Sequence, residues 1–484
     1  MCIPSGKLNN ADEAVPQDYA DGTKWFRKVA DQVNGRRSTL DVHNPNVPSL
    51  KPMRFSPTFQ GCRSVWLGLV IVLVLSGIGM PVCGRPAGSQ WQVGAPIATY
   101  YQGPGCGAPP RFELLATAVG KLADSGFNLV WCQSVADLDT AHAHGLRGMV
   151  QTIDPTHIDD PQRREGLAAN IDMVKDHPAM YAYYIDDEPS ATEFPALGRL
   201  IAFIRERDPK HLAYINLFPT YASAGAQGTS GDKVTAYREY LRRFIEEVKP
   251  DLISYDHYHM RFTDRAFDGS DYFLNLALVR EAALEGGVPF LNVVQACANG
   301  PGWRTPNGDE GRYLAFTTLA YGGQGIAQFV YNAWEGAEHW GGVENPNGTL
   351  TPLGEALHQI NPEFVAVGEV LQPLTSLGAY HLGVVPSGAV GLPPDASFTV
   401  DPAVAPEEVN GILLGYFGTG GTPSHVLVVN LDYSKAVTTT VVGPGPMEVF
   451  DAVTGEWHPA SDGARAQISP MPGGGKLVRL RGAE

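Results

Sequence analysis

The chain has 484 residues, 44% of them hydrophobic, so it can bury a large core and is long enough for two domains. Gly and Pro are frequent, with 55 and 38 residues, which favours many tight loops. The formal net charge of −16 argues against nucleic acid as a partner, because binding a phosphate backbone needs clustered Lys and Arg. The six cysteines match no zinc-binding spacing, and we expect neither a metal nor a cofactor.

An uninterrupted apolar run occupies residues 65–80 and follows Arg54 and Arg63. This order is typical of a secretory signal or an uncleaved membrane anchor, and the run would permit membrane association. Met53 opens a normal-looking signal peptide, whereas the residues before it are polar and without periodicity. We therefore interpret 1–52 as a mis-annotated or disordered leader and 53–84 as a signal peptide or anchor. The protein is expected to be exported, as a secreted, periplasmic or membrane-anchored form.

From residue 95 onward, short apolar strands alternate with amphipathic helices in a fixed order. Eight such units predict an α/β fold, a (β/α)8 TIM barrel, over residues 95–372. A doubly wound open sheet is the alternative, but no Gly-rich phosphate loop follows the first strand. The predicted strands are 96–101, 128–132, 148–153, 182–187, 214–218, 252–258, 290–295 and 325–331. Helices are predicted at 111–125, 163–176, 194–207, 237–248, 272–284 and 312–321.

The texture of the sequence changes after residue 371, where helical periodicity gives way to alternating strands. Turns rich in Gly and Pro separate these strands, a pattern that predicts a C-terminal all-β sandwich domain over residues 373–484. The predicted strands are 412–417, 425–432, 437–442, 447–450 and 476–480. No cluster of catalytic residues is present in this part.

The carboxyl ends of the barrel strands carry amides and aromatic rings beside carboxylates. Functional side chains of such barrels come from these ends. Carboxylates and amides suit pairs of sugar hydroxyls, and aromatic faces suit the apolar face of a sugar ring. The side chains expected to bind substrate are Tyr101, Trp131, Asn216, Tyr258, Gln295, Tyr331 and Trp334. The structural alternatives are a core plug for Trp334 and a strand-end turn for Asn216.

The strongest functional signal is the end of the fourth predicted strand, where Asp186, Asp187 and Glu188 follow an apolar, aromatic run. Adjacent carboxylates raise one another's pKa, which costs stability. A chain tolerates that cost where one carboxyl must stay protonated to act as an acid. The structural alternative is a solvated turn in which Glu188 caps the next helix. Asp256 ends another apolar strand on the same rim, and we expect it to be functional as well.

These motifs resemble those of glycoside hydrolases of the clan A type, and more loosely those of family 42 β-galactosidases. Asp187-Glu188-Pro189 is similar to the Asn-Glu-Pro that ends strand four in the clan, and Asp256-His257-Tyr258 and Trp334 are further similarities. The resemblance covers about residues 95–480 and implies that Glu188 is the general acid/base. The chain departs from the clan at Gln295, which stands where the clan has its nucleophilic glutamate and cannot form a glycosyl ester.

A glycosidase of this kind therefore needs another second carboxylate. Asp256 is the first candidate, as nucleophile or as base for water, and Glu335 is the last. The second candidate is a mechanism without a second catalytic carboxylate. In it Asp187 orients an acetamido group of the substrate while Glu188 protonates the leaving oxygen, as in acetamido-assisted hexosaminidases. A non-catalytic carbohydrate-binding barrel is the alternative class. The separation of the carboxyl groups discriminates, since roughly 5–5.5 Å favours retention and roughly 6.5–9.5 Å favours inversion.

Overall fold

The computed structural model of the chain describes residues 93–101, 116–151, 158–261, 271–299, 302–332, 339–345 and 347–483. The leader and the apolar run expected within 1–84, together with Trp334 and Glu335, lie outside the described residues. Within the described ranges, every helix is too short or too polar to cross a membrane.

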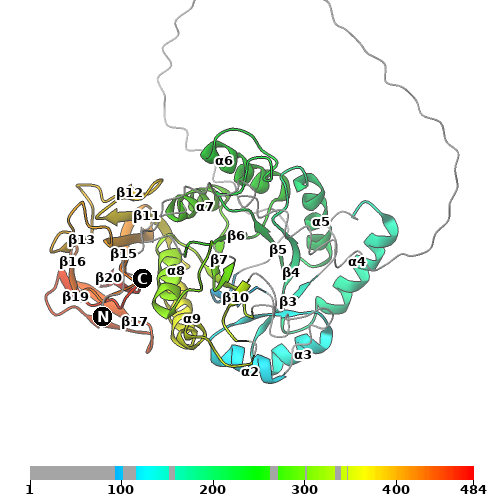
Figure 1. Cartoon of the computed structure of the whole chain (residues 1–484), viewed down its shortest axis with the longest axis horizontal. Helices are drawn as coiled ribbons and strands as arrows, with labels where there is room; N and C mark the ends of the chain where they lie inside the picture. Colours follow the sequence, from blue (N-terminus) through cyan, green and yellow to red (C-terminus); the bar gives the residue numbers. More distant parts are fainter. Residues whose placement is uncertain are drawn as a thin grey trace, which may run out of the picture. The chain divides into compact units, whose positions relative to one another are not determined.

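Eight parallel strands form one sheet in the order β1-β9-β7-β6-β5-β4-β3-β2, with helices around it (Figure 1). The predicted barrel is thus confirmed. The strands are β1 (Ile97–Tyr100), β2 (Leu129–Cys132), β3 (Arg147–Gln151), β4 (Met180–Asp187), β5 (Leu212–Leu217), β6 (Ile253–His257), β7 (Phe290–Gln295) and β9 (Gly325–Phe329). The helices are α2 (Ala116–Asp124), α3 (Val135–Ala143), α4 (Pro161–Val174), α5 (Phe194–Arg207), α6 (Lys233–Arg243) with the π-helix η3 (Phe244–Val248), α7 (Tyr272–Gly286), α8 (Gly308–Ala320) and α9 (Pro352–Leu371).

An asparagine side chain joins β1 to β2, the two strands at the ends of the sheet order. The backbone N–H of Asn128 donates to Ala98 O at 2.9 Å. Its side-chain Oδ1 accepts from Ala98 N at 3.0 Å, and its Nδ2 donates to Pro96 O at 2.8 Å. The Asn128 amide therefore supplies backbone-like hydrogen bonds where the barrel closes.

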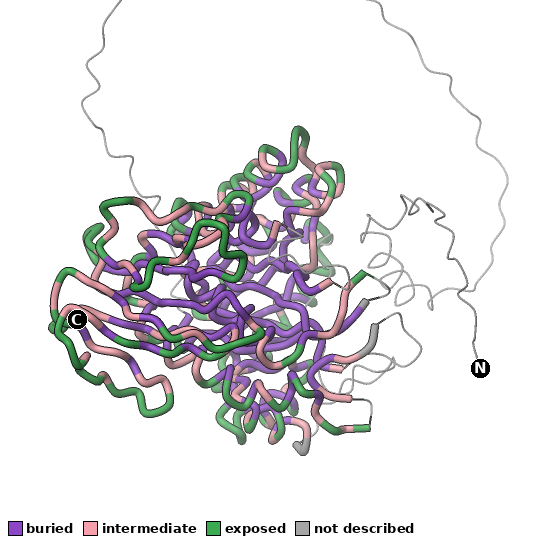
Figure 2. Tube along the Cα trace, turned by 60° about the vertical axis from the view of Figure 1, so that its left-hand side comes forward, coloured by how far each residue is buried: buried purple, intermediate pink, exposed green. Residues whose placement is uncertain are grey.

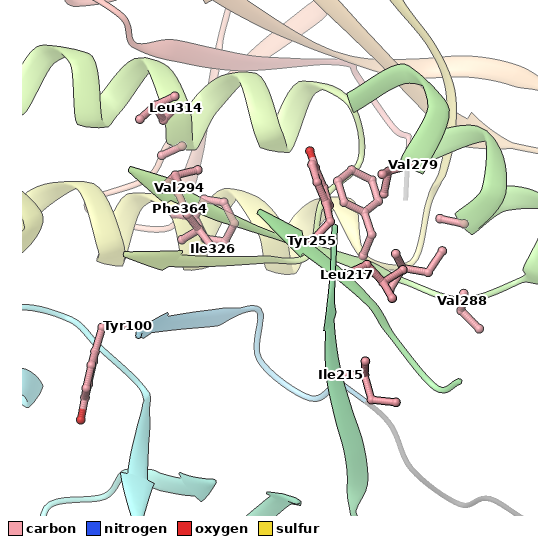
Figure 3. Packing of buried hydrophobic residues seen from close by; sticks show 14 of the residues in the cluster. Tyr100, Ile215, Leu217, Tyr255, Val279, Val288, Val294, Leu314, Ile326 and Phe364 are labelled. Carbon is pink, nitrogen blue, oxygen red and sulfur yellow. The ribbon is translucent and has the colours of Figure 1, made fainter. Parts of the chain in front are cut away.

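Side chains of the barrel strands alternate between two apolar layers, as the period of two of a strand requires. An inner cluster is made of residues from strands and strand ends, such as Leu212 and Tyr214 of β5. The neighbouring Ile215 and Leu217 belong to an outer cluster that also contains helix residues such as Val279 of α7. Figure 3 shows this outer packing, and Figure 2 shows that buried residues run through the strands. The position of a residue in this alternation decides whether its side chain can reach the barrel mouth.

Two sheets follow the barrel and enclose a core of their own, which confirms the predicted all-β region. Their strands pair antiparallel except for β11 and β12, which pair in parallel. The larger sheet has the order β12-β11-β14-β15-β20-β17-β18 and the smaller one β13-β16-β19. Their shared apolar cluster includes Leu414 and Val426 from the larger sheet and Val441 and Ile468 from the smaller. The strands are β11 (Thr375–Leu382), β12 (Val390–Gly391), β13 (Thr399–Asp401), β14 (Ile412–Thr419), β15 (Thr422–Asn430), β16 (Thr439–Val442), β17 (Met447–Asp451), β18 (Glu456–Pro459), β19 (Arg465–Ile468) and β20 (Gly475–Leu480).

A short antiparallel pair lies beyond the ends of β7 and β9. It consists of β8 (Cys297–Asn299) and β10 (His339–Gly341), with Ala298 opposite Trp340. Sequence periodicity did not predict these two strands. They extend the chain past the carboxyl ends of the barrel strands, at the end of the barrel where the candidate site lies.

Candidate active site

A β-bulge in β4 decides which carboxylate of the acidic run faces the barrel interior. Tyr184 pairs with Tyr214 of β5, but Asp186 pairs with the next residue, Ile215, so one residue of β4 is unmatched. Because of this shift Asp187, and not Asp186, lies opposite Asn216. Such bulges re-aim side chains and are frequent beside active sites.

Glu188 follows directly and adopts a left-handed backbone conformation with φ of +50°. This conformation costs a residue with a Cβ about 1–2 kcal/mol. The backbone N–H of Glu188 donates to Asn216 O at 2.8 Å, which holds the turn at the end of β4. The chain thus keeps a strained residue at the point where the Glu188 side chain meets Asp256.

The carboxyl groups of Glu188 and Asp256 lie close together, and each affects the pKa of the other. Burial, followed by the charges of Asp256 and Asp187, raises the pKa of Glu188 well above its usual range. Burial and then the charge of Asp187 raise the pKa of Asp256 to about 8. A proton is therefore held on this pair at neutral pH, in the manner of two carboxyls forced together.

Asn216 bridges the two aspartates that flank this proton. Its Nδ2 donates to Asp187 Oδ1 and to Asp256 Oδ1, both at 3.1 Å. Ser254 Oγ donates to Asn216 Oδ1 at 3.0 Å, and Tyr214 OH lies 2.6 Å from Ser254 Oγ. The amide is only 3% exposed, so both of its ends are committed to protein groups. Asn216 was expected to bind substrate, and it instead binds the acidic residues.

Among Asp187, Glu188 and Asp256, Asp187 is the acid that ionises most readily. Burial raises its pKa to about 6, and hydrogen bonds from Asn216, Tyr101 and Tyr184 oppose that rise. Tyr101 OH lies 3.3 Å from Asp187 Oδ1 and also 3.3 Å from Tyr184 OH. At neutral pH a mainly ionised Asp187 therefore lies beside the proton-bearing pair. The sequence predicted that like charges would raise the pKa values, but burial is the larger cause.

Aromatic rings surround the carboxyl groups. Trp131 packs against Tyr101 and Tyr184, with ring centroids 5.4 and 4.6 Å apart, and its own ring is partly exposed. Tyr258 packs against Phe329 of β9 at 5.0 Å and against Trp303 at 4.9 Å. The structure thus brings together Tyr101, Trp131, Tyr258 and the three acidic residues that were predicted from the sequence.

Two predicted substrate contacts are placed elsewhere. Gln295 lies at the carboxyl end of β7 but is only 1% exposed. Its side-chain amide forms hydrogen bonds with backbone groups. Its Nε2 donates to the carbonyls of Met260, Cys297 and Arg304 at 2.9, 3.2 and 2.6 Å, and its Oε1 accepts from Met260 N at 2.8 Å. This arrangement ties the β6 and β7 ends together and does not fit direct contact with a sugar.

Tyr331 is fully buried in the outer layer, against the ring of Tyr100 at 5.2 Å. Its hydroxyl donates to Glu344 at 3.2 Å. Both Phe329 and Val330 belong to the inner cluster, so the strict alternation ends with β9 and the next residue faces outward. The expectation that Tyr331 contacts substrate is therefore wrong. Trp334 cannot be placed, because it lies outside the described residues.

Tyr184, Tyr214, Ser254 and Phe329 are parts of the site that the sequence analysis did not select. Tyr214 lies two positions before Asn216, and Ser254 lies two positions before Asp256; both Asn216 and Asp256 were predicted site residues. Residues two apart in a strand share a face, so this periodicity was the signal that would have found them. Across the described residues, there is no group of three His, Cys, Asp or Glu side chains that could hold a metal ion.

Comparisons with known proteins give structural similarity at low sequence identity. No protein-family model and no curated protein sequence match the chain. Solved structures with which it aligns include a family 39 glycoside hydrolase from Bacteroides cellulosilyticus WH2, with 12% identity over 80% of this chain and 81% of the other and a TM-score of 0.44. A glycoside hydrolase family 5 structure from Bacteroides vulgatus aligns with 11% identity over 79% and 89%, with a TM-score of 0.46.

A third such structure is an endo-β-1,4-mannanase from Thermotoga petrophila, with 11% identity over 78% of this chain and 97% of the other and a TM-score of 0.38.

Proposed function

We propose that this chain is a glycoside hydrolase that acts on an extracellular oligo- or polysaccharide, with Glu188 as general acid/base and Asp256 as the second carboxylate. The observation that supports this most directly is the juxtaposition of Glu188 and Asp256, two buried carboxyl groups whose pKa values are both raised. The pair lies at the carboxyl ends of β4 and β6, where barrel enzymes place their chemistry. A carboxyl that keeps its proton near neutral pH is what a general acid requires.

In the proposed reaction Glu188 gives its proton to the glycosidic oxygen while the bond from that oxygen to the anomeric carbon breaks. Asp256, as a carboxylate, either bonds the anomeric carbon or takes a proton from a water that attacks it. In the first case, water later cleaves the glycosyl ester and Glu188, now ionised, takes the proton of that water. In the second, Asp256 ends protonated. Either way, one water is consumed for each glycosidic bond.

The resting geometry adds a step before this reaction. In the resting protein the Glu188 carboxyl interacts with Asp256. The glycosidic oxygen must displace Asp256 from this position to accept the Glu188 proton. Asp256 then ionises while Asn216 Nδ2, at 3.1 Å, continues to donate to it. Substrate binding and preparation of the second carboxylate are thereby coupled.

Acetamido-assisted hydrolysis is a second candidate, favoured by the fixed position of Asp187. Its Oδ1 is held by Asn216 and by the Tyr101 hydroxyl, and its pKa of about 6 leaves it mainly ionised at neutral pH. An aspartate held in this way suits the N–H of an acetamido group. In this case Asp256 would serve only to keep the proton on Glu188.

A screen of the purified protein tests the proposal. Aryl glycosides with and without a 2-acetamido group, and plant, algal and bacterial polysaccharides, would be offered to the wild type and to Glu188→Gln. Hydrolysis that is lost in the variant supports the glycosidase. Hydrolysis confined to 2-acetamido substrates supports the second candidate. Binding of a polysaccharide without hydrolysis of any substrate would overturn both in favour of a carbohydrate-binding barrel.

A further inference from the structure

Arg261 lies at the mouth of the barrel, beyond the end of β6. It forms an antiparallel bridge with Trp303, and its carbonyl accepts from Arg304 Nε at 3.2 Å. Partners directly opposite in an antiparallel pair present their side chains on the same face. The Trp303 ring packs on Tyr258, a member of the inner cluster. The side chain of Arg261 therefore starts beside the aromatic rings that flank the candidate site.

The guanidinium of Arg261 forms no ion pair and no hydrogen bond with the part of the chain that the structure describes. Its Nε is buried without a partner, although the residue as a whole is partly exposed. The neighbouring Arg304 differs, because it forms a bidentate pair with Glu310 at 2.7 and 2.5 Å. A buried donor left unbonded costs free energy, so the Arg261 group is better satisfied when an acceptor is brought to it.

The charge of Arg261 reaches Tyr221, a residue that also feels the charges of the carboxyl pair. Burial, then the charges of Asp256 and Glu188, raises the pKa of Tyr221 well above its usual range, and the charge of Arg261 opposes this rise. Tyr221 is thus within electrostatic range of the acidic pair and of the arginine. A mouth with three acidic residues, of which Asp187 is mainly ionised at neutral pH, in a chain of net charge −16, repels anions in general. An arginine at that mouth, without a partner among the described residues, would offset this repulsion at one place.

We propose that the substrate is an anionic saccharide, and that Arg261 binds a carboxylate or sulfate group on the sugar unit next to Trp303. The planar guanidinium suits such groups because it can donate two parallel hydrogen bonds. A sugar ring lying against Trp303 would carry its anionic group to the arginine on the same face. This inference rests on the proposed glycosidase function and names the substrate class of that site.

The test compares matched oligosaccharides that differ only in their anionic group. Wild type, Arg261→Gln and Arg261→Lys would be assayed on galacturonate or glucuronate oligomers, on sulfated oligomers and on the neutral galactose or glucose oligomers. The readout is the ratio of kcat/KM for the anionic substrate to that for its neutral match. We expect this ratio to fall about 10- to 100-fold in Arg261→Gln, mainly through KM, as for a lost charge-assisted pair. Arg261→Lys should keep part of it.

Arg238→Gln is the matched control, since it removes one arginine from an exposed pair with Glu281 on the outside of the barrel. It should leave the ratio unchanged. The wild type should also lose its preference for anionic substrates in high salt. An equal ratio in wild type and Arg261→Gln, with neutral substrates hydrolysed, would overturn this inference but leave the glycosidase standing. No hydrolysis of any of these oligomers, neutral or anionic, would also overturn this inference, and the wider substrate screen would then decide on the glycosidase function. Comparison of the uronate oligomers with the sulfated oligomers shows whether Arg261 binds a carboxylate or a sulfate group.

Discussion

Ser254 Oγ donates to Asn216 Oδ1 at 3.0 Å, and this contact fixes which end of the Asn216 amide faces the acidic residues. With the oxygen held by Ser254, the Nδ2 group must point to Asp187 and Asp256. Those donations lower the pKa of both aspartates against the effect of burial. Ser254 therefore acts on the carboxyl pair through Asn216, without touching either acid in the contacts described here.

Ser254→Ala should shift the pH profile of hydrolysis. Without the serine the amide is free to turn, its donation to Asp256 weakens, and the pKa of Asp256 rises. If Asp256 must be ionised, the acidic limb of kcat/KM moves to higher pH and the optimum value falls about 3- to 10-fold, as for one lost hydrogen bond. Ser254→Thr should restore the profile in part. Ser469→Ala, at an exposed position just after β19, is the control. An unshifted acidic limb would contradict the positioning role.

Glu188→Gln should lose activity according to the leaving group. A general acid contributes about 10²- to 10⁴-fold, and only substrates with poor leaving groups need it fully. We expect losses of that size on unactivated oligosaccharides and much smaller ones on nitrophenyl glycosides. Glu206→Gln, an exposed residue of α5, should change neither. If Glu188→Gln hydrolyses every active substrate at the normal rate, the assignment of the proton donor is wrong.

Asp256→Asn should damage hydrolysis of both substrate types equally, because a nucleophile or base is needed whatever the leaving group. Assays of the two substrate classes side by side check this. Near-normal turnover of Asp256→Asn combined with an inactive Asp187→Asn would instead support acetamido assistance. Asp187 and Asp256 accept hydrogen bonds of equal length from Asn216, so each variant removes one acceptor from the same amide.

The same substitution should stabilise the fold at high pH. The pKa values of Asp187 and Asp256, about 6 and about 8, lie above the value of about 4 expected in the unfolded chain. The folded state therefore binds more protons, and its stability falls as pH rises from about 4 through about 8. Asp256→Asn removes one of these buried acids. We expect it to raise the unfolding free energy by about 0.5–2 kcal/mol at pH 8, with a difference that vanishes toward pH 4. Denaturant titrations across this range measure it.

The sequence pattern was sufficient for the barrel because short apolar strands and amphipathic helices follow one another in a fixed order. The prediction for 290–295 coincides with β7, and that for 194–207 coincides with α5. In contrast, five strands of the C-terminal sheets were missed, namely β11, β12, β13, β18 and β19. Four of them have only two to four residues, and β11 alternates irregularly between buried and less buried positions. Local sequence also could not reveal the bulge at β4, which depends on pairing with β5 and turns Asp187 inward.

The roles of polar residues were harder to predict than their positions. Asn216 and Gln295 were both correctly predicted to lie at the carboxyl ends of barrel strands. In the structure, however, both side-chain amides form hydrogen bonds with protein groups. A sequence gives the donor and acceptor groups but not the partners that reach them from distant loops. For Gln295, those partners are carbonyls at residues 260, 297 and 304.

Export remains a prediction, since the apolar run at 65–80 lies outside the described residues. We expect the mature chain to begin after about residue 84. N-terminal sequencing of the protein released from the producing cells would check this. Recovery of residues 1–52 on a protein that stays in the cytosol would contradict it.

Gln295→Glu should not create the missing nucleophile. Glutamate has the same shape, so the variant places a carboxyl where the resembling clan has its catalytic one. However, the Nε2 position of Gln295 faces three backbone carbonyls, and a second acceptor oxygen there would meet only other acceptors. The new carboxyl must either stay protonated or push the loop away. We expect no gain in hydrolysis. We also expect a loss of stability of about 1–3 kcal/mol, which is the cost of leaving buried groups unsatisfied, and this loss should grow with pH.

Gln162→Glu, on the exposed start of α4, is the control and should leave both properties unchanged. Thermal melts and assays at several pH values measure the outcome. A Gln295→Glu protein that is more active than the wild type would show instead that the barrel lost its catalysis through this one residue.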